Sequence, residues 1–211
     1  MERKGSDVEV EKKTRRKPAG AAVLQDSVTT AIYRALFEEW AETGYSALHM
    51  KNIAARAGVG KAALYRRSKS KFELVTEAVA ATATSITPIP DTGSFAGDVT
   101  ALIRKLAVTL RHPLVRRILP DLHAENARSD ELNDLLERVT LDRRTQANVM
   151  IDRAIAREEL PEATDRGLIL DMLIAPLYWR VIVQRRTATS EDINRFSNIV
   201  RAFAEQENAS A

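Results

Sequence analysis

Apolar residues recur at three- and four-residue steps along most of this 211-residue chain, and this is the period of an amphipathic helix. Ile32, Leu36 and Trp40 show the pattern, because a helix brings all three to one face. No segment stands out with the alternating period of a half-buried strand. The sequence therefore predicts an all-α fold, and its length suffices to bury the core of one or two compact domains.

Glycines, prolines and capping residues divide the pattern into about nine helices. We expect them near residues 26–42, 50–57, 60–67, 70–86, 99–111, 114–124, 130–159, 165–183 and from 190 onward. Pro120 should interrupt the sixth helix, and Pro176 lies inside the eighth. Residues 87–97 hold two prolines and two glycines, so we expect them to form the loop before a second domain.

Residues 50–68 are expected to form a helix-turn-helix, in which two short helices cross at a tight turn. Gly58 can take the positive φ that such a turn needs, and Val59 and Leu64 would fill the space between the helices. The residues of the second helix that would then face outward are Lys61, Ala62, Tyr65 and Arg66. A helix of this size fits the major groove of DNA; the alternative is an ordinary helical hairpin.

Charge favours the DNA-binding interpretation of this region. The net charge of the chain is only +3, but residues 43–72 hold seven basic side chains and no acidic one. Such a surface is typical of a protein that faces phosphates, although a solvated basic patch without a role is the alternative. Double-stranded operator DNA is therefore the expected partner.

The stretch Ile32–Leu74 resembles, without gaps, the DNA-binding domain of the TetR family of bacterial regulators. The residues that carry the resemblance are Trp40, Gly44-Tyr45, Ile53-Ala54-Ala55-Arg56-Ala57-Gly58-Val59, Leu64-Tyr65-Arg66, Ser70-Lys71 and Leu74. It implies a three-helix N-terminal DNA-binding domain and a larger helical C-terminal domain for ligand binding and dimerisation. Residues 157–161 and 171–180 resemble, more loosely, one of the family's actinobacterial-type regulatory subgroups.

The resemblance implies a set of DNA-contacting residues, which are His49, Lys51, Gly60, Lys61, Ala62, Ala63, Tyr65, Arg66, Arg67, Ser70 and Lys71. Among them, Lys61 would contact a guanine edge, and Ala62 and Ala63 would meet thymine methyl groups. Tyr65 would contact a phosphate. The start of the fourth helix, with Lys71, would hold another phosphate through the helix dipole and the ammonium charge.

Three positions depart from the family pattern. His49 stands where Ser or Thr usually caps the helix, so either Ser46 caps it or His49 itself contacts phosphate. Ser68 replaces an aromatic residue that normally packs under the turn, so this corner should be looser. Arg67 stands where His is common, which adds charge.

The last two helices are expected to pack against their copies in a homodimer, as the resemblance implies. Residues 168–183 are apolar nearly all round, which is more than one buried face needs; the alternative is a central core helix of a monomer. The residues expected in the interface are Met172, Ala175, Tyr178, Trp179, Ile182, Ile193, Phe196, Val200 and Phe203.

A small-molecule effector is also implied by the resemblance. The candidate lining residues of its pocket are Leu106, Leu110, Leu119, Leu122, His123, Met150, Tyr178 and Trp179. Apolar side chains mixed with a His, a Tyr and a Trp would suit a neutral or weakly polar molecule; the alternative, which base rates favour for each residue, is that it belongs to a simple core.

We expect neither an enzyme nor a cofactor. The chain has no cysteine, and its three histidines lack the spacing of metal ligands. The motif Ser68-x-x-Lys71 of acyl-transfer enzymes stands without its companion motifs, so we expect no catalytic and no metal site. No run approaches 18 apolar residues; we therefore expect no membrane contact and a cytoplasmic, nucleoid-associated protein.

We expect a disordered basic arm over residues 1–22, a helix-turn-helix domain over 23–69, a regulatory and dimerisation domain over 70–206 and a disordered tail over 207–211. The leading hypothesis is a dimeric repressor that a small-molecule effector releases from its operator. The alternative is an architectural or protein-interaction member that binds DNA without such a switch. A helical enzyme would need a convergent pair of titratable groups, and the sequence offers none.

Overall fold

The computed structural model describes residues 20–86 and 89–210, and every regular element in that part of the chain is helical. The elements are α1 Gly20–Thr43, α2 Met50–Ala57, α3 Lys61–Arg67, α4 Lys71–Ile86, α5 Phe95–Arg111, α6 Pro113–Asn126, α7 Asp130–Ala156, α8 Arg166–Tyr178, the π-helical turn η1 Trp179–Val183, and α9 Ser190–Ser210. The prediction of an all-α fold with about nine helices is confirmed. Most of the expected arm, residues 1–19, and residue 211 of the expected tail lie outside the described residues.

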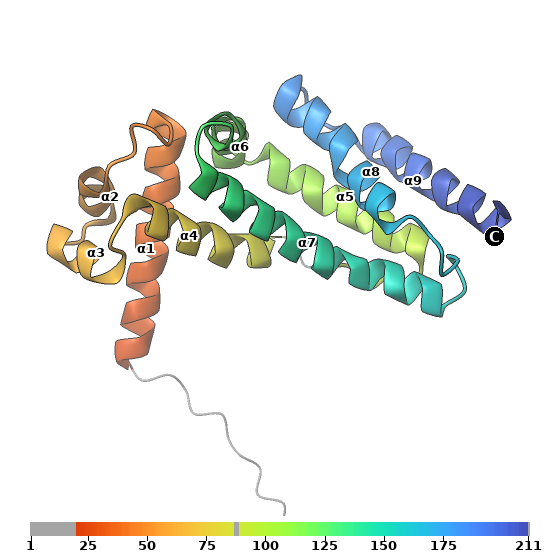
Figure 1. Ribbon diagram of the computed structural model, residues 1–211, viewed down its shortest axis with the longest axis horizontal. Helices are drawn as coiled ribbons and strands as arrows, with labels where there is room; N and C mark the ends of the chain where they lie inside the picture. The colour runs from red at the N-terminus through yellow and green to blue at the C-terminus, as the bar shows by residue number, and fades with distance from the viewer. Residues whose placement is uncertain (1–19, 87–88, 211) are drawn as a thin grey trace, which may run out of the picture.

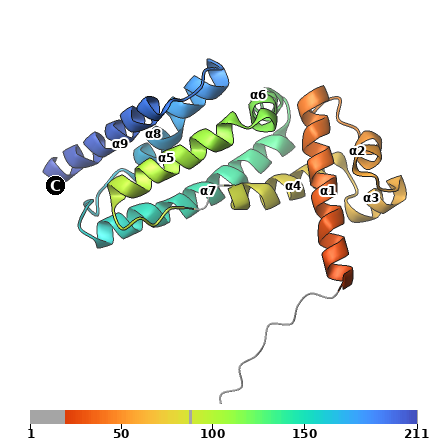
Figure 2. The ribbon, with the colours of Figure 1, turned by 180° about the vertical axis from the view of Figure 1, so that it is seen from behind.

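The helices form two groups with separate apolar cores. Helices α1 to α4 gather at one end of the molecule, and α5, α7, α8 and α9 run side by side toward the other end (Figure 1, Figure 2). The first core is built around Leu36, Trp40 and Ile53, and the second around Ile103 and Met150. None of the described helices combines the length and the apolar character that crossing a membrane requires.

The first core is not closed by α1 to α4 alone. Ile118 and Leu122 from α6, and Leu132 and Leu135 from α7, are buried in the same cluster as the N-terminal helices. Helix α6 packs directly on α1, and α7 packs on α4. The N-terminal helices are therefore joined to the rest of the chain through a shared apolar core.

Several helix ends differ from the predicted ones; α1, for example, begins at Gly20 and not near residue 26. Helix α5 begins at Phe95 because Ser94 caps it by accepting a hydrogen bond from the Gly97 N–H. Helix α6 continues through Pro120 to its end, since this exposed proline costs one backbone hydrogen bond but no core contact. After Pro176 the helix widens into η1, where the Gln184 N–H bonds to the Trp179 carbonyl five residues before it.

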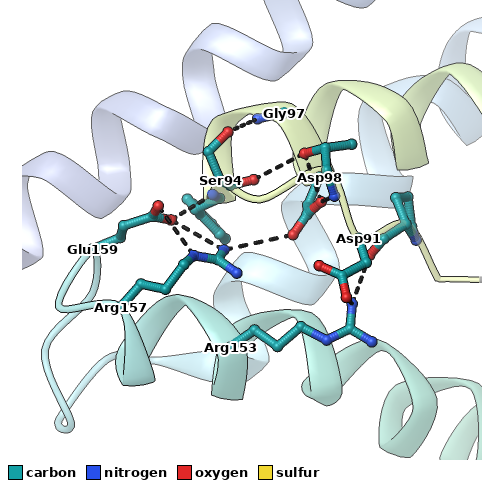
Figure 3. Close-up of polar contacts among 10 residues, drawn as sticks. Asp91, Ser94, Gly97, Asp98, Arg153, Arg157 and Glu159 are labelled. Atoms are coloured by element: carbon teal, nitrogen blue, oxygen red, sulfur yellow. Dashed lines mark hydrogen bonds and ion pairs between the residues drawn. The ribbon is translucent and has the colours of Figure 1, made fainter.

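The loop before α5 is fixed to the end of α7 by a polar cluster (Figure 3). The fully buried carboxylate of Asp98 accepts hydrogen bonds from the Thr92 N–H at 2.6 Å and from the Thr92 hydroxyl at 2.8 Å. Arg157 stands 3.7 Å from the same carboxylate. Arg153 donates to the Pro90 carbonyl at 2.9 Å. These contacts hold residues 90–92 against the helices that follow the loop, α5 to α9, which we call the regulatory helices.

Candidate nucleic-acid interface

Helices α2 and α3 meet at a tight turn centred on Gly58. This residue has φ 69° and ψ 25°, and it ends α2 in the left-handed conformation that glycine adopts without strain. The Val59 N–H bonds back to the Ala54 carbonyl at 3.0 Å. Ile53 from α2 and Leu64 from α3 are fully buried beneath the turn. Residues 50–67 thus form the helix-turn-helix that their spacing predicted.

The face of α3 that points away from the core is continuous and exposed. The exposed residues on it are Lys61, Ala62, Ala63, Tyr65 and Arg66. Leu64 is the one residue of the helix that is fully buried. The Lys61 ammonium lies 5.7 Å from the centre of the Tyr65 ring, which is within the range of a cation–π contact. Both small and charged side chains are therefore available to a ligand along this face.

The start of α2 has no side-chain cap. His49 takes the N-cap position with an extended backbone, but its side chain is exposed and bonds to no helix N–H. Ser46, the alternative cap, donates instead to the Glu125 carboxylate at 2.9 Å. Gly60, at the N-cap of α3, also has no capping side chain. The first N–H groups of α2 and α3 are therefore not bonded by a side-chain cap and can bind an acceptor of a ligand.

Three basic side chains of the acid-free window bond to other groups of the protein. The Arg56 guanidinium contacts Glu42 and Glu39 of α1 at 2.5 and 3.1 Å. Arg67 donates to the Thr29 hydroxyl of the same helix. Lys71 is directed toward the loop between α1 and α2. The other four basic residues of the window, which are Lys51, Lys61, Arg66 and Lys69, are exposed.

The buried Glu39 carboxylate holds α2 against α1. It accepts a hydrogen bond from the Asn52 amide at 2.8 Å and pairs with Arg56 at 3.1 Å. We expect Glu39→Ala to lower the free energy of unfolding by about 1–3 kcal/mol, because it leaves the Asn52 amide without its acceptor and removes one of the two carboxylates that bind Arg56, as urea unfolding can measure. Glu38→Ala is the matched control, since Glu38 lies 3.8 Å from Arg56 in a far more exposed position. Equal losses from both variants would contradict this role.

The corner beneath the turn is polar where the family has an aromatic residue. Ser68 is fully buried and donates to the Glu77 carboxylate at 3.1 Å. An open groove of about 620 Å³ lies beside it, lined by Tyr33, Arg67 and Glu77 among others. The groove agrees with the looser packing expected here. The next helix start is well capped, because Ser70 accepts from the Glu73 N–H at 3.0 Å.

The residues predicted for the regulatory region divide by exposure. Ile182, Ile193 and Val200, predicted in the interface, are buried in the core of their own chain, whereas Trp179 is 59 % exposed. The other predicted interface residues that are partly buried are Met172, Tyr178, Phe196 and Phe203, and Ala175 is exposed. Of the predicted interface residues, the exposed Trp179 and Ala175 are therefore the ones most accessible to a partner chain.

The predicted pocket residues do not line one common cavity among the hollows described. Leu110 and Met150 belong to the second core and Leu122 to the first, while Leu106 and Leu119 pack against the second core. The exposed His123 meets Tyr178 edge-on, with ring centres 5.5 Å apart. His123 also lines an open groove of about 410 Å³ between α6 and α7.

Two carboxylates with structural roles at this interface were not identified from the sequence. Glu39 supports α2, and Asp121 contacts the loop before α2. Their partners lie 13 and 76 residues away in the chain. The one sequence signal for such a contact is an acidic residue between apolar ones in a helix. Asp121 is such a residue, because it lies between Pro120 and Leu122.

Models of two protein families match the chain. The model described as "Bacterial regulatory proteins, tetR family" matches residues 32–78, which include the helix-turn-helix. The model described as "Tetracyclin repressor-like, C-terminal domain" matches residues 89–200, which is more than half of the chain. Together the two models cover nearly all of the described helices.

Whole proteins give the same result. The HTH-type transcriptional regulator YdeS of Bacillus subtilis is 28 % identical over 78 % of this chain and 80 % of its own length. The DNA-binding transcriptional repressor TetR of Mycobacteroides abscessus is 31 % identical over 65 % of this chain and 73 % of its own. Among solved structures, the flavonoid-responsive regulator FrrA aligns with a TM-score of 0.68 at 22 % identity, covering 86 % of this chain and 96 % of its own. Salmonella enterica GusR gives 0.67 at 18 % identity, covering 86 % and 95 %.

Proposed function

Because the chain belongs to the TetR family of DNA-binding transcriptional regulators, we propose that it is a dimeric repressor which a small-molecule effector releases from its operator. Members of this family are transcription regulators and not enzymes, which confirms that expectation. Its place of action would be the nucleoid. The observation that carries the proposal is the exposed, mixed small and basic face of α3 above a rigid turn.

The recognition contacts follow from this face. Lys61 stands in the first turn of α3 and would donate to a guanine edge, while Ala62 and Ala63 would meet thymine methyl groups. Tyr65 would contact a phosphate. His49 and Lys51 would contact others, because the uncapped start of α2 attracts anions, and the exposed Ser70 would contact another at the start of α4. Arg67 and Lys71 would contribute less, since their charged groups are engaged inside the protein.

The proposed dimer interface is the exposed apolar stripe of α8, η1 and α9. Its large members are Leu168, Trp179, Val183 and Ile199, each at least 42 % exposed, and Ala175 lies exposed on α8 between them. Large exposed apolar residues on helices that pack against one another favour a partner surface. Because Ile182, Ile193 and Val200 face their own core, we assign them to supporting the interface from behind.

The proposed effector site is the groove between α6 and α7 beside His123. The side-chain oxygen of Asn126, at the end of α6, lines this groove region, is buried and has no hydrogen-bond partner. A buried acceptor without a donor costs free energy, so a ligand that donates a hydrogen bond there would be favoured. This supports a small, weakly polar effector. The effector must bind the two states of the protein with different affinities to release DNA.

A mobility-shift assay with DNA flanking the protein's own gene tests the proposal. At moderate salt we expect one retarded species that resists competition by shuffled DNA. Binding without any sequence preference would remove the repressor role. The effector is tested separately by adding small molecules to the complex: a molecule that dissociates it should also stabilise the DNA-free protein against heat, because it binds the folded state.

A further inference from the structure

One carboxylate on α6 contacts the DNA-binding helices at two points. An oxygen of Asp121 accepts a hydrogen bond from the Trp40 indole N–H at 2.6 Å and from the Tyr45 backbone N–H at 2.9 Å. Trp40 ends the buried stripe of α1, and Tyr45 lies in the loop that leads to α2. A single oxygen therefore ties both α1 and the entry to the helix-turn-helix to α6.

The chain makes room for this contact with Gly44. This residue has φ 80°, a conformation that other residues adopt only with strain. A Cβ atom at this position would also stand 3.1 Å from the second oxygen of Asp121. Both the backbone conformation and the available space thus let the loop approach the carboxylate closely.

Helix α4 also contacts this loop, through Lys71. The Lys71 ammonium donates to the Tyr45 carbonyl at 2.8 Å and lies 4.2 Å from the centre of the Tyr45 ring. Burial lowers the pKa of Lys71, while Glu125 on α6 opposes the shift. A second hydrogen bond between the loop and α6, from Ser46 to Glu125, lies close by. The loop is thus held by α4 and α6 together.

Helix α6 contacts the N-terminal helices through apolar burial as well as through these hydrogen bonds. Burial of Ile118 and Leu122 stabilises contact but is not directional. Hydrogen bonds to an ionised carboxylate are directional and about twice as strong as neutral ones. The hydrogen bonds to Asp121 are therefore suited to set the orientation of the helix-turn-helix relative to α6.

We propose that Asp121 is a positioning residue: it sets the orientation of the helix-turn-helix relative to the regulatory helices, and thereby the distance between the two recognition helices. DNA affinity then depends on a residue that is absent from the DNA-binding face. The inference rests on the proposed dimeric repressor, because only a protein with two recognition helices has a spacing to keep.

The experiment compares an isolated half-site with full operators whose half-sites are moved apart by one or two base pairs, using an operator selected with the full chain. Fluorescence anisotropy gives the affinities. We expect Asp121→Ala to keep the half-site affinity of the wild type and to lose about tenfold or more of its preference for the correct spacing. Asp121→Asn should restore part of the preference, because its amide oxygen can accept both hydrogen bonds but lacks the carboxylate charge.

Asp152→Ala is the matched control, since it removes a helical carboxylate that pairs with Arg166 away from the DNA-binding helices. An unchanged spacing preference in Asp121→Ala would overturn the proposal. So would an equal loss on the half-site, which would mean that Asp121 merely keeps the domain folded. If Asp121→Ala does not fold, Trp40→Phe removes the indole donor together with part of the buried ring volume, and it is judged by the same two measurements. A wild type that binds full site and half-site equally would instead remove the dimer.

Discussion

Lys61→Ala should lower the affinity for the operator by about 1–3 kcal/mol, roughly tenfold to a hundredfold, while affinity for random DNA falls far less. Lys61 is exposed in the first turn of the recognition helix, where side chains reach base edges in the major groove. Its long side chain leans over the Tyr65 ring, so it is partly ordered before DNA arrives. Titration of labelled operator and random duplexes at one salt concentration measures both affinities.

Two variants give this result its meaning. Lys69→Ala removes an exposed charge from the turn after α3, and we expect it to weaken binding to all sequences alike and to reduce the salt dependence. Arg104→Ala removes an equally exposed charge from α5, and it should change neither affinity. If Lys61→Ala weakened operator and random DNA by the same factor, Lys61 would be a phosphate contact and not a base contact.

The helix-turn-helix could be predicted because its causes are local. The apolar stripe of α2, Gly58 and the single inward Leu64 are neighbours in the chain, and each acts through backbone chemistry within one or two turns. The same holds for the start of α4, where the Ser70 hydroxyl accepts a hydrogen bond from the Glu73 N–H three residues later in the chain. Elements whose geometry depends on close neighbours are the ones that a sequence specifies by itself.

The direction of the basic side chains could not be predicted in this way. Arg56 and Lys71 lie in an acid-free window, but folding brings Glu42 and the Tyr45 carbonyl to them from other elements. The number of basic residues in a segment equals the number that can contact DNA only if no group from another part of the chain binds their charged groups. Asp121 illustrates the same limit, because its partner Trp40 is 81 residues away.

The regulatory region differs because its apolar pattern serves two surfaces at once. Residues 168–183 are apolar nearly all round, so period alone cannot separate the side that faces the core from the side that faces a partner. The π-helical turn after Pro176 adds one residue to the turn and rotates the residues that come after it. Ile182 consequently points into the core and Val183 to the outside. An ideal helix drawn from the sequence misplaces Ile182.

Trp179→Asp is expected to separate the proposed dimer into monomers of 23.5 kDa at micromolar concentration, as sedimentation velocity can measure. Trp179 is the most exposed aromatic residue of the stripe on α8, η1 and α9, and a central tryptophan commonly contributes about 2 kcal/mol or more to an interface. In a two-fold interface each substitution occurs twice, so the loss is about 4 kcal/mol, on the order of a thousandfold in dimer affinity.

Operator affinity should fall with the dimer, because a monomer binds one half-site and loses the gain from joining two. Val108→Asp is the matched control: Val108 is 57 % exposed on α5, nearly the same as Trp179, but it lies outside the stripe. It should leave both mass and affinity unchanged. Dissociation by both variants would mean that any new charge on these helices disrupts the assembly, whereas a Trp179→Asp dimer that still binds its operator would place the interface on another face. If Trp179→Asp dissociates the dimer and Val108→Asp does not, the exposed residues of α8 and η1 form the interface that holds the two recognition helices together.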